Sequence, residues 1–304
     1  MIQGSDDTRY AYINGMIRAR EARLLTRGHF DRLIAGSFDN FRTIIADSPY
    51  AGHDDIVPGF HAELAGVREF ARTYCMTPQV TNMVEWPEQI HDLKVKLKHG
   101  SEELLYSDAS SEVETWPEVV DEVGRYALDK DPFVLSTALD RILCKYLTKA
   151  AEFSPFFRTY YRLYFDLENI RSFFRARQFD DSRDLFKQVF IPYGNLNRAV
   201  FLDIITTGYE HLGKIFFSTP YMSLIERGCV YLEEKQSFLR LERLTEEMRL
   251  GFIKQARTYT FGVEPLFCYY EFKKNEIKKL RQVYYGKLNE VAVDELKESI
   301  PDVW

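Results

Sequence analysis

The sequence lacks the long apolar segments that membrane insertion or secretion would require. Its longest uninterrupted apolar run is Leu266 to Tyr270, whereas a membrane-spanning helix needs about 20 mostly apolar residues. The N-terminus carries Asp6 and Asp7 and has no apolar core segment, so no signal peptide is predicted. The chain is therefore expected to be a cytosolic protein that does not itself span a membrane.

Basic charge and closely spaced cysteines are also missing. The net charge is -6, which argues against non-specific binding to nucleic acid. The four cysteines lie far apart and have no metal-ligand spacing, so they are expected to be reduced thiols; they are Cys75, Cys144, Cys229 and Cys268. No Ser-His-Asp or Cys-His arrangement has a recognisable local signature.

Two stretches imitate catalytic or binding motifs. Residues Gly208 to Ile215 nearly match a phosphate-binding loop, but Ile215 stands where a hydroxyl group must bind Mg²⁺. His29, His53, Asp54 and Asp108 imitate the ligands of a metal-dependent phosphohydrolase, yet His53 and Asp54 lie among Pro and Gly residues that indicate a loop, whereas metal ligands need rigid positions. We therefore predict no catalytic residue, no metal and no cofactor, and keep the phosphohydrolase as an alternative.

What the sequence does contain is helical periodicity and many aromatic residues, which make up 15% of the chain. No stretch shows the sustained alternation of a strand, so an all-α fold is predicted. Residues 61–74 are expected to form a helix, with helix starts at Asp131 and Ser154 and a helix end at Gly286. A loop is expected over 47–60, a break between Pro78 and Pro87, and a linker over 107–122. Within 186–207 two interpretations stay open, because the apolar runs 189–191 and 201–205 fit short strands as well as helices.

A six-residue pattern occurs three times, and such internal repetition bears on the whole fold. Its copies are Gln89 to Lys94, Asp166 to Arg171 and Glu276 to Arg281. In each copy an apolar residue is followed three positions later by another, then directly by a basic residue. A third apolar residue follows four positions after the second. The copies lie 77 and 110 residues apart, which suits three related helical domains better than a short solenoid unit.

The C-terminal copy carries a family resemblance. Residues Phe261-Gly-Val-Glu-Pro-Leu266, then Glu276 to Arg281 and Gly286 to Asn289, resemble the C-terminal signature of the C subunit of V/A-type ATPases, whose eukaryotic relative is the d subunit. Asp166 to Arg171 is similar to the central repeat of that family. Gln89 to Lys94 departs from the usual Asp and Asn at the first and fourth positions. Residues 36–85 and 102–122 resemble the family least.

The resemblance implies three similar helical domains arranged as a funnel. The corresponding limits are 1–120, 121–205 and 206–304, with repeat helices near 89–99, 166–177 and 264–287. It further implies a non-catalytic rotor subunit on the cytoplasmic face of the membrane. Its partners would be the central-shaft subunits and the membrane rotor ring, and it would transmit torque between ATP hydrolysis or synthesis and ion transport. An unrelated helical-repeat scaffold is the other alternative.

The basic residue at the sixth repeat position is the candidate binding group, present as Lys94, Arg171 and Arg281. Each follows a core residue, so it lies beside the buried stripe of its helix. One interpretation is structural, with the stem packed on the core and the charged end paired to a neighbouring acid. The other is that the three side chains line a common surface that receives the shaft.

Overall fold

The computed structural model describes residues 4–46, 48–52, 56–99 and 111–302. Over these ranges every regular element is an α-helix or a short 3₁₀-helix, and no strand is present, so the prediction of an all-α fold is confirmed. None of the described helices is long and apolar enough to cross a lipid bilayer.

The helices form two compact units. Unit 1 comprises residues 1–76 and 206–304; its helices are α1 (Ala11–Glu21), α2 (Arg27–Ala35), α3 (Phe41–Ile44), α4 (Ile56–Tyr74), α11 (Tyr209–Ile215), α12 (Met222–Lys235), α13 (Leu239–Lys254), α14 (Glu264–Leu288) and α15 (Val293–Glu298). Unit 2 comprises residues 77–205; its helices are α5 (Pro78–His99), α6 (Pro117–Asp129), α7 (Pro132–Ala151), α8 (Pro155–Ala176), α9 (Ser182–Val189) and α10 (Arg198–Asp203). The division into three domains stays a prediction.

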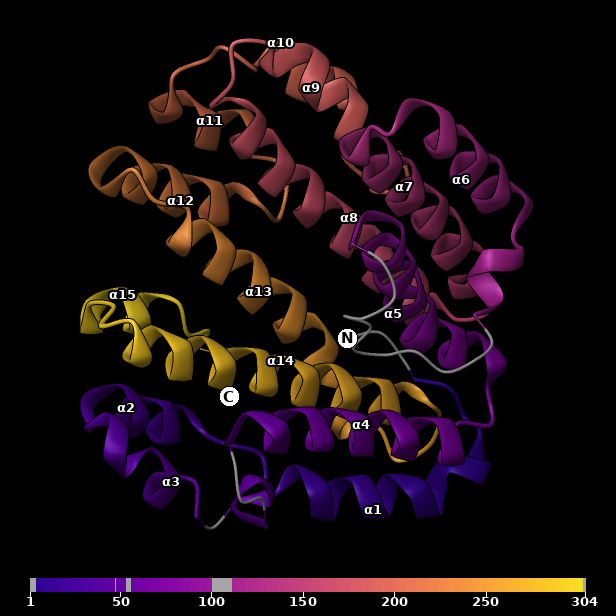
Figure 1. Cartoon of the computed structure of the whole chain (residues 1–304), viewed down its shortest axis with the longest axis vertical. Coiled ribbons are helices and arrows are strands. Elements are labelled where there is room, and N and C mark those ends of the chain that lie inside the picture. Colours follow the sequence, from indigo (N-terminus) through magenta and orange to yellow (C-terminus); the bar gives the residue numbers. More distant parts are fainter. Residues whose placement is uncertain (1–3, 47, 53–55, 100–110, 303–304) are drawn as a thin grey trace. The chain divides into compact units, whose positions relative to one another are not determined.

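Helix α14 is the central element of unit 1. It begins with Glu264 and Pro265 in its first turn, where the missing N–H of proline costs little. Most of its residues are buried, because α1, α2, α4, α13 and α15 all pack against it; Figure 1 shows α4 running alongside α14. Buried aromatic rings such as Phe267 and Tyr270 fill the contacts.

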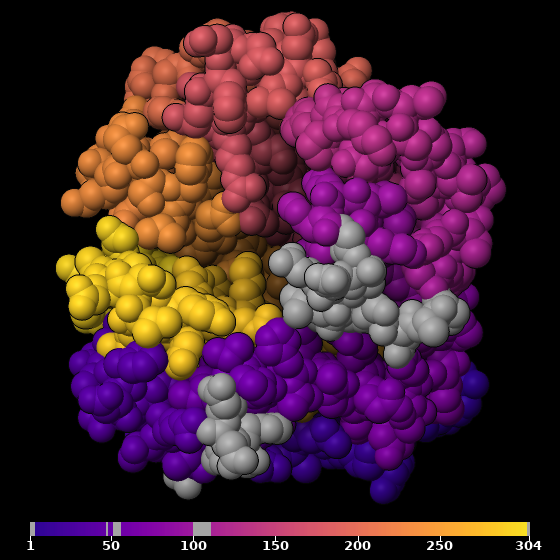
Figure 2. All heavy atoms as spheres, in the orientation of Figure 1, coloured from indigo at the N-terminus to yellow at the C-terminus, as the bar shows by residue number. Residues whose placement is uncertain are grey.

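The C-terminal segment is fastened to the N-terminal helices of the same unit. Lys287 Nζ donates to the backbone oxygens of Ile34 at 2.9 Å and Gly36 at 2.6 Å. Arg27 Nη1 donates to the oxygen of Ile300 at 2.9 Å. Figure 2 shows the yellow atoms of this segment directly against indigo atoms of the N-terminal helices. Residues at opposite ends of the sequence therefore complete one core.

The stretch before α14 binds the chain's N-terminal segment. Gly262 has φ +82°, a left-handed conformation that favours glycine. Its N–H donates to the oxygen of Asp7, and its own oxygen accepts from Asn14 Nδ2, both at 3.1 Å. The buried Glu264 carboxylate accepts from Ser5 N at 3.1 Å. The motif singled out in the sequence thus holds residues 5–14 against the start of α14.

Unit 2 is built around α7, which packs against α5, α6 and α8. Asp131 caps its start by accepting from Phe133 N and Val134 N, as expected from the sequence. Trp116 stacks on Tyr146 with ring centres 3.7 Å apart. A second aromatic cluster joins α8, α9 and α10 through Phe173, Phe186 and Phe201, whose ring centres lie 5.1–5.7 Å apart.

Helices occupy much of two segments that the sequence left open or assigned to a linker. The run 189–191 begins at the last residue of α9, and the run 201–205 begins in α10, so neither is a strand. Phe186 and Phe201 are buried core residues of these helices. A short apolar run by itself does not distinguish a strand from a buried helix segment. Of the linker predicted over 107–122, residues 107–110 lie outside the described residues, and the remainder contains a 3₁₀-helix at Glu112–Thr115 and the start of α6. Although this stretch is acidic, it folds because the side chains of Val113, Trp116 and Val119 are buried.

Three predicted helix limits also differ. Helix α4 begins at Ile56, five residues before the expected start and inside the expected loop, with Pro58 in its first turn. Helix α5 continues through Pro87, where burial of Trp86 and Ile90 offsets a cost of about 3 kcal/mol for an interior proline. Gly286 does not stop α14, which ends at Leu288; it allows close approach of Leu296, whose Cδ2 would lie 2.5 Å from an added Cβ.

Alanine substitution should have opposite effects at two glycines of unit 1. In Gly262→Ala the new Cβ would lie 2.8 Å from the oxygen of Ser5 in a left-handed conformation, so unfolding free energy should fall by more than about 1 kcal/mol. In Gly251→Ala, inside α13, the new Cβ meets nothing within 4 Å, and stability should rise by about 0.5–1 kcal/mol. Urea unfolding measures both. Equal stability of the two variants would contradict the anchoring role of Gly262.

Candidate partner-binding site

The three repeat copies occupy the same place on three helices. Their first residues, Gln89, Asp166 and Glu276, each follow by eleven residues a proline in the first turn of α5, α8 or α14. These prolines are Pro78, Pro155 and Pro265. Eleven residues make about three helical turns, so in each helix the repeat begins on the same face as the proline. The repeat therefore has one register on all three helices.

The first repeat position binds the backbone of a distant segment in every copy. Asp166, fully buried, accepts from the N–H groups of Asn195 at 3.0 Å and Leu196 at 2.8 Å. Glu276, also fully buried, accepts from the N–H of Leu25 at 2.5 Å. In the first copy, Gln89 Oε1 accepts from Val113 N at 3.4 Å.

The fourth repeat position does the same in two copies. Asn169 donates to the oxygen of Ile191 and accepts from its N–H, both at 2.8 Å. Lys279 Nζ donates to the oxygen of Ser299 at 2.8 Å and pairs with Glu246 at 2.6 Å. Burial alone would raise the pKa of Glu246, but the ammonium groups of Lys279 and Lys278 lower it to about 2. These polar positions were missed as functional in the sequence, although their shared place beside the apolar stripe was a visible signal.

In unit 2 two of the sixth-position cations have acidic partners, and both of these acids act on one buried thiol. Lys94 Nζ lies 2.5 Å from Asp140 Oδ1, and Arg171 Nη1 lies 2.7 Å from Glu168 Oε1. The side chains of Lys94 and Arg171 are only 17% and 23% exposed. Burial raises the pKa of Cys144 in α7, Asp140 and Glu168 add to this effect, and Lys94 opposes it. Both ion pairs therefore lie close to α7.

Arg281, the third cation, lies in unit 1 and has a different environment. Its Nη2 lies 3.3 Å from His61 Nδ1, and among the described residues no carboxylate pairs with it. Its Nε is buried without a hydrogen-bond acceptor in the described part of the chain. Burial lowers the pKa of His61, and the Arg281 charge lowers it further. Arg281 thus differs from Lys94 and Arg171 in having no salt-bridge partner among the described residues.

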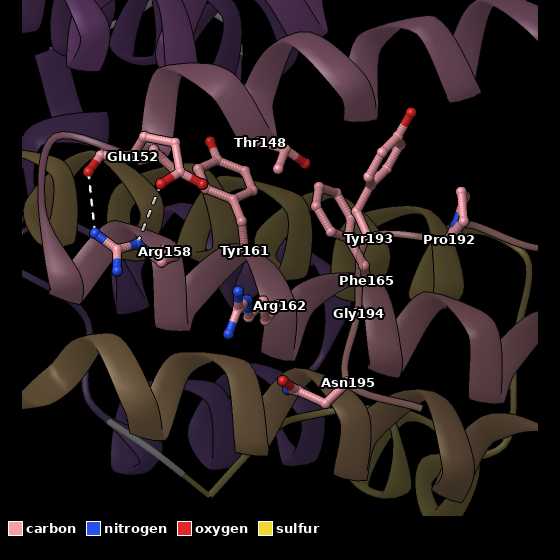
Figure 3. A pocket seen from close by; sticks show the side chains of 11 residues that line it. Thr148, Glu152, Arg158, Tyr161, Arg162, Phe165, Pro192, Tyr193, Gly194 and Asn195 are labelled. Carbon is pink, nitrogen blue, oxygen red and sulfur yellow. Dashed lines mark hydrogen bonds and ion pairs between the residues drawn. The ribbon is translucent and has the colours of Figure 1, made fainter. Parts of the chain in front are cut away.

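A cavity of about 440 Å³ in unit 2 adjoins the second repeat. Its wall includes residues 192–195, the loop that Asp166 and Asn169 hold. Figure 3 shows Arg158 bound to Glu152 at one end of the cavity and the rings of Phe165 and Tyr193 at the other. The mixture of rings and guanidinium groups suits an apolar side chain with a nearby acid.

The other sequence candidates do not form a catalytic site in the described residues. Gly208 to Ile215 forms helix α11 with Gly208 as its N-cap, so it is not a loop that surrounds phosphates. His29 belongs to a capping box, in which its Nδ1 accepts from Thr26 N at 3.0 Å. His53, Asp54 and Asp108 lie outside the described residues. Within the described ranges no group of three His, Cys, Asp or Glu side chains is placed to hold a metal.

Comparison with known proteins shows similarity to one family of rotary ATPase subunits. The sequence model of the ATP synthase (C/AC39) subunit family matches residues 89–299, a range that contains all three repeats. The C subunit of the V-type sodium ATPase of Enterococcus hirae is 22% identical over 329 aligned positions. That alignment covers 97% of this chain and 99% of the Enterococcus protein, so the similarity extends beyond the signature segments.

Removal of the Asp166 carboxylate should destabilise the protein more than removal of its neighbour on α8. Asp166→Ala leaves the N–H groups of Asn195 and Leu196 without their acceptor, at about 1–3 kcal/mol for each buried group. Glu168→Ala breaks a partly exposed ion pair worth roughly 0–1 kcal/mol. We expect urea unfolding to show a loss above about 2 kcal/mol for the first and below about 1 kcal/mol for the second. Similar losses in both variants would contradict the role of Asp166 in holding the loop.

Proposed function

Because this chain belongs to the ATP synthase (C/AC39) subunit family, we propose that it couples the central shaft of a rotary ATPase to the membrane rotor ring. The chain is a non-catalytic subunit of a rotary ATPase. In the proposed role it transmits torque between ATP hydrolysis or synthesis and ion transport through the ring. The observation that carries this proposal is the family match over 89–299.

The proposed place is the cytoplasmic face of the ring, with the shaft seated among three helical domains. Three copies of one helix register support a threefold arrangement of similar parts. The extensive aromatic packing of both units is compatible with the stiffness that torque transmission requires. The absence of a membrane span from the described helices is compatible with a peripheral position.

Affinity purification of the tagged chain from its own cells tests the coupling role. Shaft subunits and ring subunits should both co-purify in a mild detergent that preserves the complex. A tagged chain that retrieves stator subunits while shaft and ring are absent would contradict the proposal.

Within this role, we propose that the sixth-position cations face the shaft, with Arg281 contributing most. Lys94 and Arg171 are partly neutralised by Asp140 and Glu168, whereas the charge of Arg281 is not offset by a described acid. A positive group in that state attracts an acidic side chain of a partner more strongly than a cation that is already paired. The three residues are equivalent in the sequence pattern, but we expect Arg281 to contribute more to shaft binding than Lys94 and Arg171.

Charge reversal at Arg281 should weaken binding of the isolated shaft by at least tenfold, or about 1.4 kcal/mol. Arg171→Glu should have a smaller effect, and both effects should shrink at high salt because exposed charges are screened. Arg227→Glu on α12 is the matched control, since Arg227 is exposed. For each variant, calorimetry measures the affinity for the shaft, and urea unfolding measures the stability. If the folded Arg281→Glu variant binds the shaft like the control, or loses several kcal/mol of stability, Arg281 is a structural residue.

A further inference from the structure

A second cavity, in unit 1, is unusually rich in cationic groups. It measures about 250 Å³ and is lined by Arg20, Arg23, Pro49, Glu63, Tyr269 and Lys273. The residues come from three places in the sequence: the end of α1 and the turn after it, the region of α4, and α14. Three of the six lining side chains are basic and only one is acidic.

Lys273 forms the fixed part of the cavity. It is only 2% exposed, and its Nζ donates to Glu276 Oε1 at 2.7 Å. Glu63 Oε2 lies 3.7 Å from the same nitrogen, which is beyond hydrogen-bond distance. Glu276 is itself held by Leu25 N and by Tyr50 OH. The ammonium group is therefore positioned in advance, and an ammonium can donate three hydrogen bonds.

Unlike Lys273, the two arginines form no ion pair with a described carboxylate. The Arg20 guanidinium lies 4.1 Å from the ring centre of Phe70 and hydrogen-bonds to the Tyr269 hydroxyl, and no described carboxylate pairs with it. The Arg23 side chain is exposed and forms no hydrogen bond or ion pair with another described residue. Guanidinium groups present paired N–H donors that match carboxylate and phosphate oxygens. Arg23 is therefore available to a ligand that enters the cavity, and Arg20 keeps N–H donors for it beyond the one bound to Tyr269.

Size and charge narrow the ligand class. Sites for drug-sized molecules usually measure about 300–1,000 Å³, so this cavity suits a smaller ligand. The cavity has three cationic side chains. Two carboxylates lie close to them, Glu63 in the cavity wall and Glu276 bound to Lys273, so the net charge of the site is one positive charge. Burial raises the pKa of Tyr269, although Arg20 lowers it, so the phenol stays protonated and can donate as well.

We propose that this cavity binds a compact oxyanion, phosphate or carboxylate, between the guanidinium groups of Arg20 and Arg23 and the ammonium group of Lys273. The oxyanion accepts hydrogen bonds from all three, and Glu63 opposes it by like charge. The site is separate from the proposed shaft contact at Arg281 and does not depend on the coupling role.

Calorimetric titration of the purified full-length chain with inorganic phosphate, and separately with acetate, tests the site. Ionic strength is held constant with chloride. We expect saturable binding of at least one of the two anions, and a rise in Tm with its concentration, since a ligand of the folded state stabilises it. Phosphate binding alone assigns a phosphoryl ligand, and acetate binding alone assigns a carboxylate; either result supports an oxyanion site.

Variants decide whether the binding occurs in this cavity. Arg23→Gln and Arg20→Gln should each weaken the affinity at least tenfold, while Arg227→Gln, which removes an exposed arginine elsewhere in unit 1, should leave it unchanged. Glu63→Gln removes the opposing carboxylate and should tighten binding several-fold. The proposal is overturned if neither anion exceeds chloride at equal ionic strength. It is equally overturned if Arg23→Gln binds like Arg227→Gln, or if Glu63→Gln weakens binding.

Discussion

The packing of unit 1 depends most on the hydrogen bonds that the buried Glu276 carboxylate accepts. The side chain is completely buried and accepts from Leu25 N, Tyr50 OH and Lys273 Nζ. A buried charge is tolerated only when its partners satisfy it, and loss of one partner typically costs about 3–5 kcal/mol. Because these partners come from the turn after α1, the segment before α4 and α14 itself, one carboxylate fixes three parts of the chain.

Asp166 performs the equivalent task in unit 2. It stands at the same register on α8 and accepts hydrogen bonds from the backbone N–H groups of Asn195 and Leu196 and from Asn195 Nδ2. Gly194 has to be a glycine for this contact, since an added Cβ would lie 2.1 Å from Asp166 Oδ1. With Asn169 bound to Ile191, the loop is held at two points. The first and fourth repeat positions therefore hold distant backbone segments in place. The cations stand at the sixth position, closer to the edge of the core.

The different roles of the repeat positions are relevant to the proposed coupling function. A part that transmits torque has to resist local opening, and opening is hardest where buried groups must break several bonds at once. The fixed acids provide such places in both units. The cations at the sixth position lie one and a half turns further along the helix and reach the edge of the core, where a partner can meet them. In the proposed role, stiffness and partner recognition would therefore come from different positions of one short pattern.

The sequence alone determined the all-α fold, the three copies of the repeat and the family resemblance, because helical periodicity and motif spacing are local properties. It also indicated the cap at Asp131 and the glycine before α14. Tertiary structure decided whether apolar runs near Phe186 and Phe201 became helices, and whether α5 could continue through Pro87. It alone distinguished Arg281 from Lys94 and Arg171 and gave Glu276 its partners. Those outcomes depend on groups up to 251 residues away in the sequence, and no local pattern specifies which of them will meet.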